Sequence, residues 1–278
     1  MIIDGHIHIS DKTTGVWNHP PFTAEELVRL MDGPFPILGA GRRVDRAVVQ
    51  PHSGETLRAD QSFGEQHGYV TEVVKKYPDR LVGCFHINPH LGVEAALKEL
   101  KRLVQEGGYR VVKLNPSLHG YMPPRSRALL DPIFETAAKL RLPIIVHMGD
   151  TPFAVPVLMA PLAEAHPQTK IILAHLGTQK VSYADEAIYV ARKNENIWLE
   201  TGWGPLPRIK EAVQAVGAGR LIFGSDCPIQ EMGSQLRPIE VLAWKPPVGM
   251  NLPEADVERI MGDNMADLLK AAEPTRNG

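Results

Sequence analysis

The chain contains very little cysteine. Its two cysteines, Cys84 and Cys227, lie far apart in the sequence. They form neither a disulfide framework nor a closely spaced Cys-x-x-Cys pair. This absence excludes a small domain held together by disulfides and a thiolate metal site of the zinc-ribbon type.

Long apolar runs and a charge imbalance are also missing. No apolar run approaches the roughly 18 residues that span a bilayer, and no basic start leads into a cleavable leader. The formal net charge is −2, which does not favour nucleic acid or an anionic membrane as a partner. We therefore expect a cytoplasmic protein that acts on a small molecule, with a homodimer as an ordinary assembly.

The first apolar segment is not followed by the glycine-rich phosphate motif of a doubly wound sheet. Instead, eight short apolar segments alternate with segments of helical spacing. Continuous apolar runs are typical of parallel strands buried on both faces. With 278 residues and no linker, the pattern predicts an α/β fold, a (β/α)8 TIM barrel forming a single domain over residues 1–278, with C-terminal helices at about 235–272. The predicted strands are 1–9, 42–51, 81–88, 109–115, 142–148, 170–176, 197–201 and 220–225.

Two histidines stand in the first predicted strand. Side chains alternate along a strand, so His6 and His8 share one face while Ile7 points into packing. Two imidazoles on one face can converge on a metal ion. Alone, this pair could equally be a polar face in contact with solvent.

Further polar residues stand at the ends of the later strands, where active sites of such barrels are built. The alternation pairs Val111 with Lys113, Ile145 with His147, and Leu173 with His175 on common faces. Buried polar groups are costly without partners, and a metal ion would supply one. Imidazole and carboxylate ligands suit Zn²⁺, Fe²⁺, Mn²⁺ or Co²⁺. The strand-end residues are His6, His8, His86, Lys113, His147, His175, Glu200, Thr201 and Asp226.

These residues, in this order, resemble the amidohydrolase superfamily. The matching fragments include Asp4-Gly-His-Ile-His8, Leu142-Pro-Ile-Ile-Val-His147, Leu173-Ala-His-Leu-Gly177 and Phe223-Gly-Ser-Asp-Cys-Pro228. The sequence is most similar to the amidohydrolase-related branch that includes aminocarboxymuconate semialdehyde decarboxylase. The resemblance extends over nearly the whole chain.

The resemblance implies a role for each matched residue. His6, His8 and His147 would bind the metal, and Asp226 would be a further ligand or a proton acceptor. His175 would act as general base or orient the reacting groups. One divalent ion, with Zn²⁺ as the first expectation, is favoured. Two ions would need a carboxylated Lys113 as a bridge.

The family also implies a small substrate, often a carboxylate. Lys113 and Arg125 are the candidate substrate-binding residues, with Arg237 as a further cation. Glu200 could accept a hydrogen bond from a ligand histidine, and Cys227 is expected to pack in the core. We expect a metal-dependent hydrolase in which activated water attacks a carbonyl of a small amide, lactone or ester. The alternative is non-oxidative decarboxylation or hydration of a small unsaturated or aromatic carboxylic acid.

Overall fold

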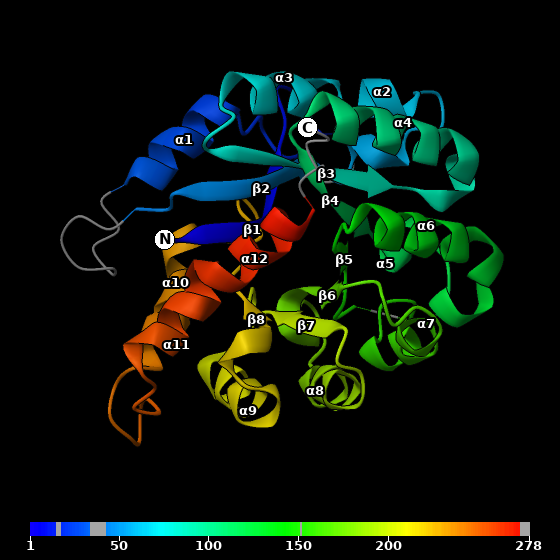
Figure 1. The fold of residues 1–278 in the computed structure, drawn as a ribbon. Helices are drawn as coiled ribbons and strands as arrows, with labels where there is room; N and C mark the ends of the chain where they lie inside the picture. Colours follow the sequence, from blue (N-terminus) through cyan, green and yellow to red (C-terminus); the bar gives the residue numbers. More distant parts are fainter. Residues whose placement is uncertain (15–17, 34–42, 151, 273–278) are drawn as a thin grey trace, which may run out of the picture.

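A computed structural model describes residues 1–14, 18–33, 43–150 and 152–272. Its eight strands form one parallel sheet whose spatial order is the chain order (Figure 1). The two outer strands also meet. Gly5 N donates to Phe223 O at 2.9 Å, and an isolated parallel bridge joins Ile7 to Cys227. The strands are β1 Ile3–Ile9, β2 Arg46–Pro51, β3 Leu81–Ile87, β4 Tyr109–Leu114, β5 Ile144–Val146, β6 Ile171–Leu173, β7 Ile197–Glu200 and β8 Leu221–Ile222.

Gly5 lets the two ends of the sheet approach. A Cβ at this position would lie 3.0 Å from Phe223 O and 3.1 Å from Ile222 Cγ2. The result is a nearly closed barrel in a single domain, which confirms the predicted fold class. The predicted second strand began at residue 42, which lies outside the described residues.

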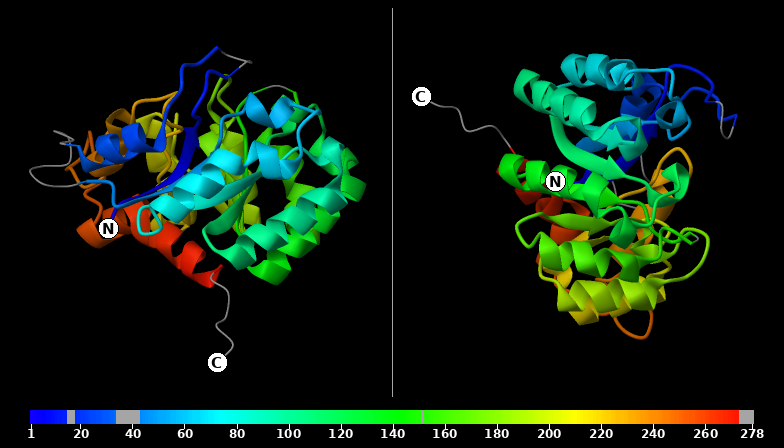
Figure 2. Two further views of the ribbon diagram at one scale, coloured as in Figure 1. Left: turned by 90° about the horizontal axis from the view of Figure 1, so that it is seen from above. Right: turned by 90° about the vertical axis from the view of Figure 1, so that its right-hand side faces the viewer.

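Helices follow the strands and wrap the barrel on its outside (Figure 2). Thr23 caps the first helix by accepting from Glu26 N, and the Glu26 side chain accepts from Thr23 N. The predicted helix over 60–77 is two helices that meet at His67. The helices are α1 Ala24–Asp32, α2 Phe63–Gln66, α3 Gly68–Lys76, α4 Val93–Glu106, α5 Pro116–His119, α6 Arg127–Leu140, α7 Ala160–Ala165, α8 Ala184–Lys193, α9 Leu206–Val216, α10 Met232–Val241, α11 Glu254–Glu258 and α12 Asn264–Ala271.

Shorter helical turns complete the connections. A π-helical segment, η7 Arg259–Asp263, joins α11 to α12, and these elements follow α10 in the region of the predicted C-terminal helices at about 235–272. The 3₁₀ turns are η1 Glu55–Leu57, η2 Pro89–Leu91, η3 Pro123–Arg125, η4 Pro156–Met159, η5 Ala174–Gly177 and η6 Ala218–Arg220.

The core has two parts. The larger lies between the strands and the surrounding helices. The smaller fills the barrel interior near the N-terminal ends of the strands, called the lower half below. Helix α12 closes this end with Met265, Leu268 and Leu269 (Figure 1). Every strand contributes to this interior cluster, through Ile3, Val48, Val82, Val111, Ile145, Ile172, Trp198 and Ile222.

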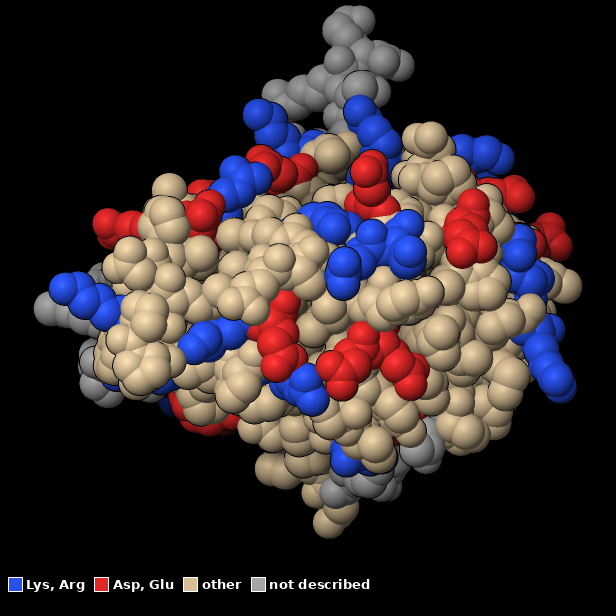
Figure 3. Space-filling view, turned by 90° about the horizontal axis from the view of Figure 1, so that it is seen from below, with Lys and Arg blue, Asp and Glu red and all other residues tan. Residues whose placement is uncertain are grey.

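The surface carries charges of both signs. On the flank of α8 and α9, Arg208 pairs with Asp185 and with Glu211. Figure 3 shows this side with basic and acidic side chains interspersed. Within the described ranges, no helix has both the length and the apolar character needed to cross a membrane.

Candidate metal centre

The two histidines of β1 point into the barrel near the C-terminal ends of the strands, called the upper half below. The pairing of β1 with β2 shifts register between Asp4 and Ile7, so β1 carries a bulge, a feature that re-aims side chains. Ile3 lies in the interior cluster, and Ile7 packs outward as predicted. The bulge therefore places His6 and His8 inside the barrel above Ile3, which uniform alternation from Ile3 would not do.

The other nitrogen of each imidazole is held by the protein. His8 Nδ1 lies 3.2 Å from Pro51 O, an atom that only accepts, so Nδ1 carries the proton. His6 Nδ1 lies 3.3 Å from Glu200 Oε2, the contact expected for Glu200. Each ring thus turns a lone pair on Nε2 toward the centre, which is how metal-binding histidines are commonly oriented.

Asp226 faces both lone pairs. Its Oδ1 lies 3.2 Å from His8 Nε2 and 3.5 Å from His6 Nε2, and all three residues are buried. Three acceptor atoms that face one another fit a cation between them. One ligand atom from each of His6, His8 and Asp226 lies within 4.8 Å of the others, and so do those of His6, His175 and Glu200. The donor set therefore fits a divalent metal ion.

Two donors reach the same nitrogens. Lys113 Nζ lies 2.8 Å from His6 Nε2, and Gln50 Nε2 lies 3.3 Å from His8 Nε2. Burial lowers the pKa of the Lys113 ammonium to about 8, although the carboxylates of Asp226 and Glu200 oppose this. Lys113 therefore lies inside the barrel, as the alternation predicts, whereas the sequence pattern carries no signal for Gln50.

His147 and His175 form a second pair beside this group. His147 Nδ1 lies 3.2 Å from His175 Nε2, and His147 Nε2 lies 3.3 Å from Asp150 Oδ2. The rings of His6 and His175 stack with centroids 5.0 Å apart. His147 is therefore at the centre but outside both three-residue groups, and its role as a ligand stays a prediction.

The route by which His175 enters the barrel differs from the prediction. Ile172 and Ala174 face the interior, whereas Leu173 packs outward, so Leu173 and His175 do not share a face through regular alternation. The chain leaves β6 after Leu173, and His175 has φ 62° in η5. This left-handed conformation is costly for a histidine, and it turns the ring inward.

Positive φ recurs around the centre, at Leu176 (49°), Trp203 (61°) and Asp226 (61°). Trp203 Nε1 donates to Asp226 Oδ2 at 2.8 Å, leaving Oδ1 directed at the histidines. Uncommon backbone conformations in several adjacent segments are typical of functional sites. Here they aim a carboxylate and an imidazole at one point.

Burial dominates the electrostatics of the centre. It raises the pKa of Glu200 to about 8, although the backbone N–H groups of His175 and Gly202 donate to this carboxyl. Burial also lowers the pKa of His6 well below its ordinary value, and Lys113 adds to that effect. Burial raises the pKa of Asp226 as well, but the imidazoles of His175, His6 and His8 outweigh it and hold the pKa well below its usual range.

Asp4 had no assigned role in the sequence, but it ties the centre together. Its Oδ1 accepts from Ser225 N at 2.9 Å and from His6 N at 3.1 Å. Burial raises its pKa to about 7 against these hydrogen bonds. Asp4 thus fixes the segment that carries Asp226 to the strand that carries the histidines. The only sequence signal was its place in Asp4-Gly-His-Ile-His8.

A cavity of about 530 Å³ opens above the centre. Lys180 lies at its mouth, 3.4 Å from Asp150 Oδ2. Arg125 is exposed at the end of η3 and is not among the cavity's lining residues, and Arg237 pairs with Glu240 on α10. The loop after β4 folds into α5 and η3, which place Arg125 on the surface. The lining includes His8, Lys113, Asn115, His147, Asp150, Lys180, Trp203 and Asp226.

A sequence model described as Amidohydrolase matches residues 3–271. The chain belongs to the amidohydrolase family. Members of this superfamily use a divalent metal ion, which agrees with the donor set described above. Cys227, buried in the outer core of this amidohydrolase, packs as predicted.

A curated relative is the dihydroorotase of Synechococcus sp. (strain CC9605), 25% identical over 177 residues, or 58% of this chain and 50% of the relative. The amidohydrolase chain thus spans about half the length of the curated relative it matches.

Solved structures share the fold. One is dihydroxybenzoic acid decarboxylase from Polaromonas sp. JS666, with bound manganese and the inhibitor 2-nitroresorcinol. It is 19% identical with a TM-score of 0.70, over 97% of this chain and 96% of that one. Another is a probable 2-pyrone-4,6-dicarboxylic acid hydrolase from Acinetobacter baumannii with citric acid bound. It is 17% identical with a TM-score of 0.66, over 97% and 99% of the two chains. At these identities the likeness concerns the fold.

Proposed function

We propose that this amidohydrolase holds one divalent metal ion between His6, His8 and Asp226 and decarboxylates a small aromatic or unsaturated carboxylic acid without oxidation. The observation that carries the proposal is the position of Lys113, a buried cation on the cavity wall 2.8 Å from a proposed metal ligand. A buried ammonium needs an anionic partner, and a substrate carboxylate supplies one. When bound, the metal would supply a Lewis acid for substrate oxygens.

The protein's own residues would then manage one proton. Loss of CO₂ breaks a carbon–carbon bond and leaves the electron pair on the substrate carbon, which takes up a proton. We keep Asp226 and His175 as the candidates for that transfer. Asp226 lines the cavity directly. His175 reaches it through His147, with which it is in contact.

Several observations support an anionic substrate. The cavity is lined by Lys113 in its interior and Lys180 at its mouth. The Polaromonas neighbour is named for decarboxylation of dihydroxybenzoic acid, and the pyrone hydrolase holds citric acid. Manganese in the first of these makes Mn²⁺ a competitor to the Zn²⁺ expected from the sequence.

Hydrolysis of a small amide, lactone or ester is the second candidate. The observation that favours it is the overlap of two donor groups at His6, one with His8 and Asp226 and the other with His175 and Glu200. A carboxylated Lys113, adjacent to His6, would bridge two ions in that arrangement. The dihydroorotase relative and the pyrone hydrolase neighbour are consistent with this chemistry.

The deciding experiment counts metal ions and identifies the product. Protein purified without added metal is analysed for Zn and Mn per chain, then reconstituted with each. It is assayed for CO₂ release from 2,6-dihydroxybenzoate and 5-carboxyvanillate, and for ring opening of 2-pyrone-4,6-dicarboxylate. About one ion per chain with CO₂ release supports decarboxylation, whereas about two ions with ring opening alone supports the second candidate. Full activity in demonstrably metal-free protein would overturn both.

A further inference from the structure

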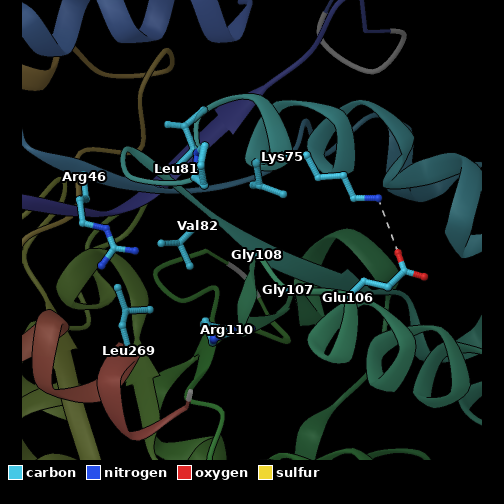
Figure 4. A pocket seen from close by; sticks show the side chains of 11 residues that line it. Arg46, Lys75, Leu81, Val82, Glu106, Gly107, Gly108, Arg110 and Leu269 are labelled. Carbon is cyan, nitrogen blue, oxygen red and sulfur yellow. Dashed lines mark ion pairs between the residues drawn. The ribbon is translucent and has the colours of Figure 1, made fainter. Parts of the chain in front are cut away.

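A second cavity, of about 350 Å³, opens at the opposite end of the barrel. Its lining includes residues from the first positions of β2, β3 and β4, together with Leu269 of α12 (Figure 4). The metal centre lies at the other ends of the same strands. The apolar interior cluster, to which Val82 and Leu269 belong, separates the two. This cavity is therefore a different site from the metal centre.

Its lining combines cations with an apolar wall. Three cations, Arg46, Lys75 and Arg110, line this cavity, whereas Glu106 is the only carboxylate among its described lining residues. Lys75 Nζ lies 3.7 Å from Glu106 Oε2, and Figure 4 shows this ion pair on one side with Arg46, Val82 and Leu269 on the other. Arg110 Nη1 donates to Tyr109 O at 2.6 Å, which anchors its guanidinium. The positive charge on the Arg46 side is thus not offset by the ion pair at the rim.

Arg46 differs from a neighbouring arginine at the same end of the barrel. Its Nε is buried and has no hydrogen-bond partner among the described residues. Arg80, in contrast, donates from Nε to Asp45 O at 2.8 Å and pairs through Nη2 with Asp32 Oδ1 at 2.9 Å. A buried N–H without a partner is uncommon and calls for an explanation such as a missing ligand. Arg80 therefore has a structural role, whereas the Nε–H of Arg46 is available to donate a hydrogen bond to a ligand.

We propose that this cavity binds a small organic acid, with its carboxylate on the Arg46 guanidinium and its apolar part on Leu81, Val82 and Leu269. A planar guanidinium forms paired hydrogen bonds with a carboxylate. The volume is at the lower end of small-molecule sites, which suits one ring or a short chain. The proposal is independent of the reaction at the metal centre.

The test titrates the metal-loaded protein with benzoate and, separately, with inorganic phosphate up to about 10 mM by calorimetry, since weak sites have dissociation constants near 1 mM. Arg46→Met removes the charge and keeps an apolar stem, and its control is Lys139→Met, an exposed cation on α6. Benzoate is also a ligand for the proposed metal centre, so the comparison concerns the benzoate binding that remains in Asp226→Ala. We expect Lys139→Met to leave that binding unchanged and Arg46→Met to weaken it about 10- to 100-fold. Arg46→Lys, which keeps the charge and threatens the fold least, should lose less than Arg46→Met.

Other outcomes would overturn the proposal. Equal benzoate binding by Arg46→Met and Lys139→Met would place the ligand elsewhere, and loss of binding in Asp226→Ala would place it at the metal centre. Phosphate binding without benzoate binding would exclude an organic acid as the ligand. Absence of heat with both probes would mean that Arg46 serves the fold alone. Thermal unfolding of each variant confirms that it is folded under the titration conditions.

Discussion

The lower and upper halves of the barrel interior are built by the same strands, yet they differ in nearly every physical respect. In the lower half, Val111 and Ile145 pack among apolar side chains under α12. Two residues further on, Lys113 and His147 are equally buried but polar. The lower half gains free energy from burial, whereas the upper half holds desolvated polar groups whose donor atoms fit a cation. Mutations in the two halves should therefore separate stability from function.

The largest effect is expected at Asp226. Asp226→Ala removes the oxygen that faces His6 and His8, so we expect metal content to fall from about one ion per chain to near zero and activity to fall by about a thousandfold or more. His6→Ala should behave alike. Asp226→Ala should still fold, but its stability in the metal-free protein should fall, because the imidazoles and the Trp203 indole lose their buried partner. Elemental analysis and thermal unfolding measure the two effects, and full activity in metal-free His6→Ala would contradict the mechanism.

The opposite result is expected in the lower half. Ile172 is fully buried in the interior cluster, so Ile172→Ala should lower the free energy of unfolding by about 2–5 kcal/mol. The folded fraction should keep its metal and its kcat. Ile172→Val, which removes one methylene, is the matched control at about 1 kcal/mol. Loss of metal from folded Ile172→Ala would mean that the halves are coupled.

A histidine outside the metal centre gives a pH test of the same comparison. His67 Nδ1 donates to Phe63 O at 2.8 Å, and its Nε2 accepts from His86 N at 2.9 Å, so the ring is held neutral. Burial lowers its pKa to about 4 from 6.5. Between pH 6.5 and pH 4, His67 therefore binds a proton in the unfolded chain but not in the folded chain. Stability from His67 is complete above pH 6.5 and is lost as the pH falls toward 4.

This loss amounts to about 3 kcal/mol, since one pKa unit corresponds to about 1.4 kcal/mol. His67→Gln should be less stable than the unaltered chain at pH 7, because it loses the imidazole that bonds Phe63 O and His86 N. The glutamine does not titrate, so the difference in the free energy of unfolding between the two chains should narrow as the pH falls to about 4. Denaturant unfolding at several pH values measures the gap. A gap that stays constant with pH would show that His67 has the same pKa in the folded and the unfolded protein.

The sequence pattern predicts the position of some site residues and not of others. Regular alternation was enough for Lys113 and His147, because β4 and β5 keep their period up to the site. It failed for His175, where the chain turns through a left-handed residue that no local pattern signals. Asp4 and Ser225 meet although 221 positions separate them, and Arg125 is displaced by a loop whose helical turns follow local proline and asparagine capping. The alternation of side chains along a strand reveals which face a residue occupies. Contacts between strand ends depend instead on closure of the barrel.

The smallest effect is expected at Glu200, which contacts both His6 and His175 but does not belong to the proposed ligand group of His6, His8 and Asp226. Its Oε2 accepts from His6 Nδ1 and from His175 N. Glu200→Gln keeps the size but weakens the acceptor that orients His6, so metal affinity should fall by about 10- to 100-fold while stability stays close to that of the unaltered chain. Competition with a chelator measures the metal affinity. Gln50→Glu is unsuitable as a control variant, because it adds a charge beside His8. Thr201→Ser, next in the chain and also buried, is the better one. If both variants kept full affinity, the orientation of His6 would come from the β1 bulge alone.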